Sequence, residues 1–191
     1  MTSVEMLILL SGPVAVGKTT LRQLLLKENG FEYVRSSAYL MELAARQGDG
    51  ISRSSLQELG DRLDEATDYK WVLDAVAVPA MAAYPEHKRW LVDAVRKERQ
   101  VAHFRAEFGP AVMHVHLAAA EHVLRQRYEG RVDGLGAPGD TTPYDIAIAH
   151  ANEVAARGLI SLADLVIDTQ LTSPQEAASL VLAHFAANGA A

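Results

Sequence analysis

A glycine-rich segment near the N-terminus holds the residues best suited to bind phosphate. From Gly12 to Thr19 the sequence is GPVAVGKT, which fits the pattern G-x-x-x-x-G-K-[ST]. The apolar run Met6 to Leu10 precedes it and leucines at helical spacing follow it, so the pattern lies between a predicted strand and a predicted helix. Glycines allow successive backbone N–H groups to turn inward around a phosphate, and the positive end of the helix adds to the attraction. The segment therefore predicts a site for a nucleoside triphosphate.

Two side chains of this segment suit the chemistry of a bound triphosphate. Lys18 supplies a positive charge to the β- and γ-phosphates, and the Thr19 hydroxyl is suited to hold Mg²⁺. We therefore expect ATP and Mg²⁺ as cofactors and Lys18 as a catalytic residue; a chance match of the motif is the alternative. The residues assigned to the nucleotide are Gly12, Pro13, Val14, Ala15, Val16, Gly17, Lys18, Thr19 and Thr20.

Asp93 and Arg96 form a second candidate pair, directly after the apolar stretch Trp90 to Val92. Ligands of a parallel sheet bind at the carboxyl ends of its strands, which places this pair at the same edge as the glycine-rich segment. A carboxylate there can orient a Mg²⁺-bound water or accept a proton from a hydroxyl group. Arg96 can bind a phosphate through two parallel hydrogen bonds. We assign both residues to catalysis and Asp93 also to the metal, with a simple helix cap as the alternative for Asp93.

Arg125, Arg127 and Arg131 flank a stretch rich in Gly, Pro and Asp between Gly130 and Pro143. Such a composition is typical of a mobile loop. Arginines carried by a closing lid stabilise the charge on a phosphoryl group in transfer, and Arg127, just before the loop, is the one we assign to catalysis. A solvated basic helix face is the alternative.

The acceptor of the phosphoryl group is expected to lie after the second predicted strand. Polar residues follow that strand, and Gln57 lies four residues after Arg53 on one face of a predicted helix. A solvated helix face explains the same pattern equally well. The residues assigned to the acceptor are Arg35, Ser36, Ser37, Arg53, Gln57 and Arg96.

His114 and His116 alternate on a predicted strand, so both imidazoles face the same side. Two histidines are a possible start of a zinc site, but the sequence offers no evident third ligand. We favour buried structural histidines.

The composition limits the class of protein. At 191 residues, 49% of them hydrophobic and 22% charged, the chain suits one soluble domain with a full core. A formal net charge of -6 without a dense Lys/Arg tract argues against duplex binding, though single-strand access in a cleft stays open. The absence of cysteine excludes disulfides and thiolate metal sites and fits a reducing cytoplasm. The apolar run after Glu5 is too short to span a membrane and has no basic leader, so we expect a cytoplasmic protein, monomeric or homodimeric, without a membrane partner.

Predicted strands and helices alternate along the chain. The strands are Met6 to Leu10, Phe31 to Arg35, Trp90 to Val92, Ala111 to Leu117 and Asp164 to Asp168. The helices follow the glycine-rich segment and then cover Ala38 to Arg46, a stretch from Ser52, a stretch from Trp71 to Val78, Gln100 to Phe108, Glu121 to Tyr128, Tyr144 to Leu159 and a final stretch from Pro174. This alternation predicts an α/β fold with a doubly wound, parallel five-stranded sheet and helices on both faces. We expect one domain, residues 1–191, with an acceptor-binding helical insertion at about 36–84 and a lid at about 125–143.

Four stretches resemble nucleoside monophosphate kinases and related small P-loop kinases, with the closest likeness to the deoxynucleotide-kinase-like branch. They are SGPVAVGKTT, VDAVR, RQRYEGR and LADLVIDT. The resemblance implies a P-loop NTPase fold of the nucleotide-kinase type and transfer of the γ-phosphoryl group of ATP to a nucleotide. It also implies a Walker-B-like place for Asp93, a substrate-phosphate contact for Arg96 and a lid position for Arg127. Ala94 and Gln100 depart from the family pattern, where Gly and an acidic residue are usual, and the lid has few arginines.

Two alternatives to a nucleotide acceptor stay open. One is a kinase of a hydroxyl group on a nucleoside, dephospho-coenzyme A, a sugar, an antibiotic or another small metabolite, or a hydroxymethylated base in nucleic acid. A hydroxyl acceptor needs a general base, whereas a phosphate acceptor is already ionised. The other alternative is a P-loop ATPase that acts as a conformational switch. The long segment Ser36 to Tyr84 favours an enzyme with a small-molecule acceptor, because it is large enough to form an acceptor-binding lobe.

Overall fold

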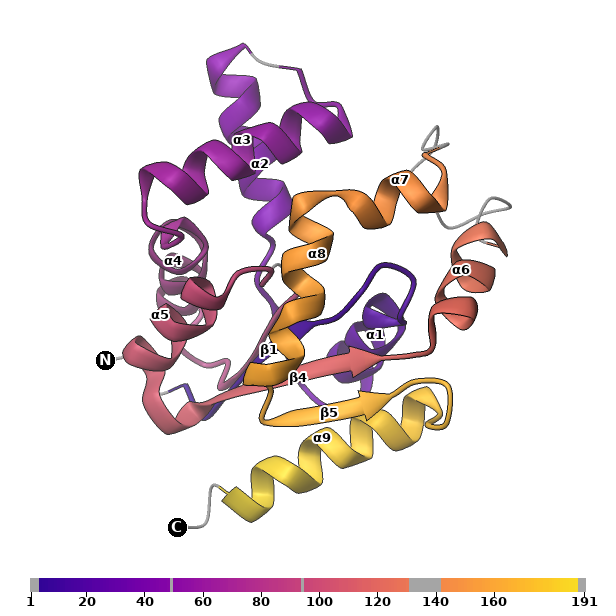
Figure 1. Ribbon diagram of the computed structural model, residues 1–191. Coiled ribbons are helices and arrows are strands. Elements are labelled where there is room, and N and C mark those ends of the chain that lie inside the picture. Colours follow the sequence, from indigo (N-terminus) through magenta and orange to yellow (C-terminus); the bar gives the residue numbers. More distant parts are fainter. Residues whose placement is uncertain (1–3, 49, 94, 131–141, 189–191) are drawn as a thin grey trace.

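A parallel five-stranded sheet forms the centre of the molecule (Figure 1). The computed structural model describes residues 4–48, 50–93, 95–130 and 142–188; for Arg53 and Asn188 it describes the backbone alone. The strands are β1 (Met6–Ser11), β2 (Glu32–Tyr33), β3 (Arg89–Val92), β4 (Val112–Ala118) and β5 (Leu165–Asp168). Their order across the sheet is β2-β3-β1-β4-β5, and every neighbouring pair is parallel. The predicted sheet is confirmed.

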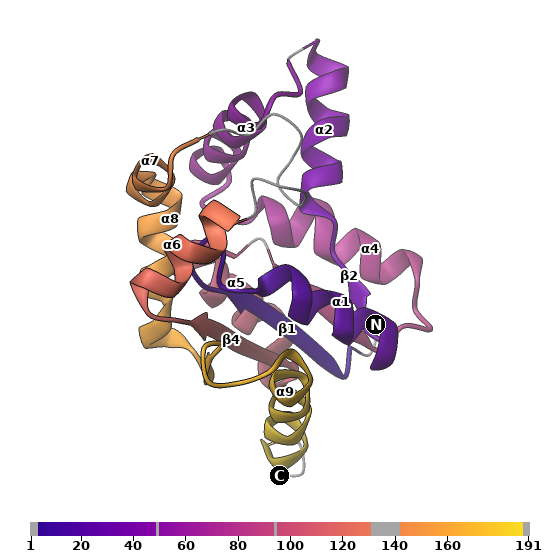
Figure 2. The ribbon, with the colours of Figure 1, turned by 90° about the vertical axis from the view of Figure 1, so that its right-hand side faces the viewer.

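Helices surround the sheet and also extend beyond it (Figure 2). The α-helices are α1 (Lys18–Glu28), α2 (Ser36–Gln47), α3 (Arg53–Ala66), α4 (Val78–Ala83), α5 (Glu98–Phe108), α6 (Glu121–Glu129), α7 (Tyr144–Ala149), α8 (Ala151–Gly158) and α9 (Pro174–Asn188). Shorter turns are the π-helix η1 (Val72–Ala77) and the 3₁₀-helices η2 (Gly109–Ala111) and η4 (Leu159–Leu162). None of the helices in the described ranges is long and apolar enough to cross a membrane.

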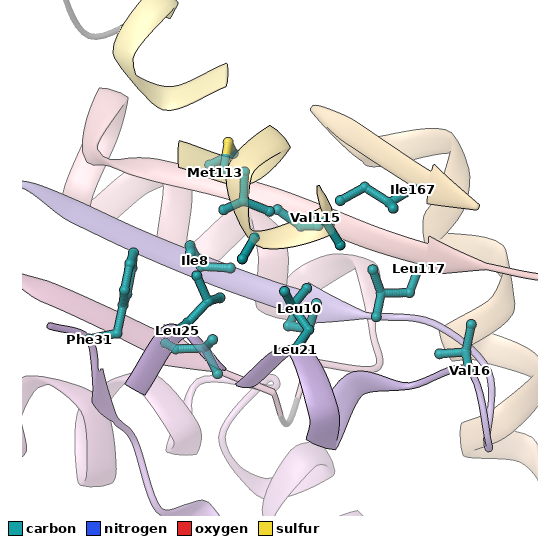
Figure 3. Close-up of a cluster of buried hydrophobic side chains, with 14 of the residues drawn as sticks. Ile8, Leu10, Val16, Leu21, Leu25, Phe31, Met113, Val115, Leu117 and Ile167 are labelled. Carbon is teal, nitrogen blue, oxygen red and sulfur yellow. The ribbon is translucent and has the colours of Figure 1, made fainter. Parts of the chain in front are cut away.

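The side chains of β1 alternate between two hydrophobic cores, one on each face of the sheet. Met6, Ile8 and Leu10 pack with residues of α1 and α9. Leu7 and Leu9 pack on the opposite face with residues of η1, α4 and α5. Figure 3 shows the first core, in which side chains from β1, α1 and β4 gather around the strand. A strand buried on both faces is apolar at every position, which is why β1 is an unbroken hydrophobic run.

The register of the sheet brings the predicted chemistry to one edge. Leu9 of β1 pairs with Val92 of β3, and Ser11 pairs with His116 of β4. The glycine-rich loop after β1 and Asp93 after β3 therefore begin side by side at the carboxyl edge of the sheet, as the fold rule predicts.

The second strand is shorter than predicted. Only Glu32 and Tyr33 form β2, although the Val34 N–H still donates a hydrogen bond to the Leu91 carbonyl at 2.9 Å. Arg35 then takes the N-cap position and α2 begins at Ser36, two residues before the predicted start at Ala38. An edge strand has one neighbour, so it can end as soon as the chain turns away toward α2.

The prediction of one long helix from Tyr144 to Leu159 is wrong in one respect, because the structure has two helices there. His150 has an extended backbone, with φ -64° and ψ 137°, and separates α7 from α8. Its side chain accepts a hydrogen bond from the Asn152 N–H at 3.2 Å, so His150 acts as the N-cap of α8. A helical spacing of apolar residues does not reveal such a cap, because histidine is a weak signal for helix starts.

The predicted insertion contains α2, α3, η1 and α4, between β2 and β3. Its role as an acceptor-binding lobe stays a prediction. The predicted lid, at about 125–143, includes the last residues of α6, which the structure describes, and residues 131–141, which lie outside the described ranges and include Arg131.

Candidate active site

The glycine-rich loop has the backbone of an anion-binding site. Gly12 has a φ of 133°, and a Cβ atom there would lie 2.4 Å from the Leu117 carbonyl oxygen, so only glycine fits. Gly17, with a φ of 104°, is the N-cap of α1. The N–H groups of Ala15 and Thr19 lie at or before the first turn of α1. N–H groups at the positive end of a helix attract phosphate.

Lys18 lies along the same loop. Its ammonium group donates hydrogen bonds to the carbonyl oxygens of Gly12 and Pro13, the second at 2.8 Å. Thr19 is exposed at the start of α1, and its role as a metal ligand stays a prediction. The predicted nucleotide residues thus occupy the loop after β1 and the first turn of α1, and their role in binding a nucleotide stays a prediction.

Two cavities meet at this loop. Cavity A, of about 830 Å³, is lined by loop residues 14–19, by Gln57 and its neighbours at the start of α3, by Asp93 and Arg96 after β3, and by Glu153 and its neighbours on α7 and α8. Cavity B, of about 430 Å³, is lined by loop residues 15–17, Leu21, Leu117, Arg127, Thr169 and the start of α9. Residues 15–17 separate the cavities, so one extended ligand can lie along the loop and reach into both.

Asp93 lines cavity A, but both of its carboxylate oxygens have partners. Oδ2 forms an ion pair with Arg22 of α1, and Oδ1 accepts a hydrogen bond from the Tyr33 hydroxyl at 2.5 Å. The Arg22 guanidinium also lies 4.5 Å from the centre of the Tyr33 ring. Burial first, and then the charge of Asp93, raise the pKa of Tyr33 well above its usual range, so its hydroxyl stays protonated and donates. The roles of Asp93 at a metal or as a base stay predictions.

Arg96 is exposed and lines cavity A, and its contact with a substrate stays a prediction. Its backbone N–H donates to Gln100 Oε1 at 2.8 Å, while Gln100 Nε2 donates to Asp64 at 3.1 Å. Gln100 is buried, and an acidic residue there would face the Asp64 carboxylate. The departure from the family pattern at Gln100 thus has a structural reason.

The residues assigned to the acceptor separate into two groups. Gln57 lines cavity A and contacts the His150 ring, with Nε2 and Nδ1 at 3.0 Å. The cavity lining does not include Arg35, Ser36 or Ser37. At the start of α2 the side chains of Arg35 and Ser37 are exposed and that of Ser36 is buried. The side chain of Arg53 lies outside the description.

Arg127 lies at cavity B. It donates to the hydroxyl and to the carbonyl oxygen of Thr169, both at 2.8 Å, and the Thr169 hydroxyl in turn donates to the Val16 carbonyl at 2.9 Å. The structure therefore joins Arg127 to the rear of the glycine-rich loop and away from Asp93 and Arg96. Its position just before the lid in the sequence did not reveal this.

We expect Arg127→Ala to raise the KM for ATP about tenfold and to change kcat little, because one partly buried cation and its hydrogen bonds are worth roughly 1–1.5 kcal/mol. Steady-state kinetics with varied ATP measures this. The control is Arg125→Ala, since Arg125 lies on the same helix and binds Asp145 outside both cavities. A kcat loss of ~10³-fold with unchanged KM would instead support the transition-state role predicted from the sequence.

Three residues of α7–α8 line cavity A that no motif in the sequence singles out. His150 contacts Gln57, Asn152 Nδ2 donates to Asp61 of α3 at 2.7 Å, and Glu153 Oε1 accepts from the Val14 N–H at 2.7 Å. These contacts fix α8 between α3 and the glycine-rich loop. The only signal in the sequence was a polar cluster inside a predicted helix.

His114 and His116 are buried beneath the loop and share one partner. The Ser11 hydroxyl lies 2.7 Å from His114 Nε2 and 2.9 Å from His116 Nδ1. Burial first, then the nearby His114 and Lys18, lower the pKa of His116 to about 4, and burial lowers that of His114. These hydrogen bonds support the interpretation as neutral structural histidines, and no group of three metal-binding side chains occurs in the described part of the chain.

The free energy of unfolding should therefore fall as the pH falls from 6.5 to about 4. In this window the unfolded chain takes up a proton at His116 that the folded protein does not. Each pH unit is worth about 1.4 kcal/mol, so the full loss from this residue is about 3 kcal/mol. Urea unfolding across the window measures it. His116→Asn should flatten the curve by about one proton, whereas His122→Asn, at an exposed position on α6, should not.

Comparisons with known proteins give one family match and several solved structures of similar fold. A family model described as "AAA domain" matches residues 8–137. A comparison with curated proteins gives no match. The deoxynucleotide-kinase-like branch stays a prediction.

Solved structures share the fold at low sequence identity. A protein from Chloroflexus aurantiacus J-10-fl, provisionally described as a kinase, has 17% identity and a TM-score of 0.57, with 98% of this chain and 100% of that chain covered. The tunicamycin resistance protein of Deinococcus radiodurans has 19% identity and a TM-score of 0.53, with 94% of each chain covered. A gluconokinase from Sinorhizobium meliloti 1021 has 14% identity and a TM-score of 0.48, which is too low to carry an argument, over 96% and 93% of the two chains.

Proposed function

Because the chain belongs to the AAA domain family, and because its glycine-rich loop joins two cavities, we propose that it is an ATP-dependent kinase of a small hydroxylated molecule. The base and ribose of ATP occupy cavity B, where Leu21, Leu117 and Arg127 offer apolar contacts and a cation. The γ-phosphate then points into cavity A beside Lys18 and Thr19. A solved protein of similar fold that carries a provisional description as a kinase is consistent with this proposal.

Mg²⁺ fits the same loop. The exposed Thr19 hydroxyl is a hard oxygen ligand at the end of the cavity that receives the γ-phosphate, and Asp93 lies at the same edge. When bound, the ion neutralises charge on the phosphates. The protein's own share is to cradle the phosphates with backbone N–H groups and to place Lys18 beside them.

The lining of cavity A is the observation that carries the choice of a hydroxyl acceptor. Among the described residues its charged side chains are Lys18, Arg96, Asp93 and Glu153. The other polar lining residues are uncharged hydrogen-bonding groups from α3, α7 and α8, such as Gln57. A nucleoside monophosphate brings about two negative charges and calls for several cations, usually arginines. A lining with two carboxylates and neutral donors suits a polar alcohol better.

A nucleoside monophosphate, the acceptor implied by the family resemblance, is the second candidate. Arg96 favours it, because this exposed side chain has no ion pair among the described residues and faces the cavity. A conformational ATPase is the third, and it predicts ATP hydrolysis without any phosphorylated product.

A screen for ATP consumption distinguishes these functions. Purified protein with Mg²⁺ and ATP is incubated with nucleoside monophosphates, nucleosides, sugars and sugar acids, aminoglycosides and dephospho-coenzyme A, and products are identified by mass. A phosphorylated alcohol supports the proposal, with Lys18→Ala as the inactive control. Phosphorylation of nucleoside monophosphates alone overturns it in favour of the second candidate. ADP release with no phosphorylated acceptor favours the ATPase.

A further inference from the structure

We infer that Glu153 is the general base that receives the proton of the acceptor hydroxyl, an assignment that rests on the proposed kinase function. In the step, the acceptor oxygen forms a bond to the γ-phosphorus and the bond from that phosphorus to the β–γ bridging oxygen breaks. ADP leaves with the bonding electron pair. The hydroxyl proton passes to the Glu153 carboxylate, which later releases it to water.

Glu153 lies where the terminal phosphate and the acceptor meet. Its Oε1 accepts a hydrogen bond from the Val14 N–H at 2.7 Å, across 139 positions of the sequence. Val14 lines cavity A and, unlike Ala15, Val16 and Gly17, does not line cavity B. Figure 1 shows α8 beside the loop that joins β1 to α1. The carboxylate is therefore held at the acceptor end of the loop.

Asp93 is the other acidic residue in the described lining of cavity A, and its surroundings suit a base less well. Both side chains are similarly buried, at 14% exposure for Asp93 and 15% for Glu153, so exposure does not decide between them. Partners do. Asp93 has one oxygen on Arg22 and the other on the Tyr33 hydroxyl. A new donor would have to displace one of these contacts.

Glu153 keeps one oxygen available. Both of its contacts, the Val14 N–H at 2.7 Å and Arg157 Nε at 3.4 Å, are made by Oε1. Oε2 accepts no hydrogen bond in the described ranges of the chain. One oxygen thus anchors the carboxylate to the loop while the other can accept a proton, as a general base requires.

Arg157 orients Glu153 without neutralising it fully. Its shortest contact goes to Glu121 Oε2 of α6 at 2.8 Å, and it also donates to the Tyr144 hydroxyl at 3.4 Å. Tyr144 in turn donates to Glu121 Oε1 at 2.7 Å. The charge of Arg157 is therefore shared mainly with Glu121, and hydrogen bonding from Arg157 lowers the pKa of Glu121. Glu153 keeps the longer contact and its negative charge toward cavity A.

The test replaces Glu153 by glutamine, which keeps an acceptor oxygen for the Val14 N–H but cannot take up a proton. Two acceptors are used: water, as basal ATP hydrolysis, and the alcohol that the screen selects. We expect turnover with both to fall ~10²–10⁴-fold. A reaction that needs a base slows at low pH, so the wild-type pH–rate profile should have an acid limb that Glu153→Gln lacks. Affinity for a non-hydrolysable ATP analogue should stay within about threefold.

Glu129→Gln is the matched control, because Glu129 lies on α6, pairs with Arg125 and does not line cavity A. Turnover of Glu153→Gln within about threefold of wild type overturns the assignment. A loss of turnover in Glu153→Gln that keeps the acid limb also overturns the assignment. The same holds for a loss explained by weaker binding of the ATP analogue, since both results indicate a structural role. A wild type that phosphorylates no alcohol refutes the proposed acceptor class, and basal hydrolysis then still tests Glu153 separately.

Discussion

Lys18→Ala should fold normally and lose phosphoryl transfer by ~10³-fold or more. The ammonium group lies against the Gly12 and Pro13 carbonyls and Lys18 lines cavity A. On the proposed function, negative charge develops there in the transition state. Removing one preorganised donor of this kind typically lowers kcat by ~10²–10³-fold, and a full positive charge contributes more. The free energy of unfolding should change by no more than about 1 kcal/mol, since the side chain is not part of either core.

The measurement is ADP formation with the screened acceptor, together with urea unfolding. Lys27→Ala is the control, because Lys27 is exposed in the last turn of the same helix. It should retain wild-type turnover. If Lys18→Ala also retains it, the motif binds no reacting phosphate and the kinase proposal fails.

The glycine-rich loop and the sheet could be predicted because their causes are local. The alternation of Leu7 and Ile8 between two cores makes β1 apolar at every position, and Gly12 is required by its approach to Leu117. The pattern G-x-x-x-x-G-K-[ST] contains these constraints within eight residues. The order of strands then places the ligand edge by a general rule of parallel sheets.

The α8 residues that line cavity A could not be predicted, because contacts between segments distant in the sequence place them there. The contact of the Glu153 carboxylate with Val14 depends on the position of α8. That position is set by the N-cap at His150 and by the hydrogen bond from Asn152 to Asp61 of α3. No spacing in the sequence contains that information.

Arg127 illustrates the same limit. Its neighbours in the sequence indicate a lid, whereas its partner is Thr169, beyond β5. For the same reason Arg35, Ser36 and Ser37, chosen by their place after a strand, do not line cavity A, because the chain enters α2 there.

Asp93→Asn should reduce turnover by ~10²-fold at low Mg²⁺, and raised Mg²⁺ should restore part of the loss. The substitution removes a negative charge from the edge of the sheet where, on the proposed function, the metal and the γ-phosphate meet. It also leaves Arg22 without its ion-pair partner, which should lower the free energy of unfolding by about 1–2 kcal/mol. The acid limb of the pH–rate profile should remain, because Glu153 and not Asp93 receives the proton.

Kinetics over a Mg²⁺ titration at several pH values measures both effects. Tyr33→Phe serves as the control, since it removes the hydrogen bond to Asp93 but keeps the carboxylate charge and the ring beneath Arg22. It should lose little activity and keep the wild-type response to Mg²⁺. A loss in Asp93→Asn that is insensitive to Mg²⁺, with the acid limb absent, would make Asp93 the base. Both carboxylates line cavity A, so the pH–rate profiles of the two variants distinguish them. The variant whose profile lacks the acid limb identifies the carboxylate that accepts the proton.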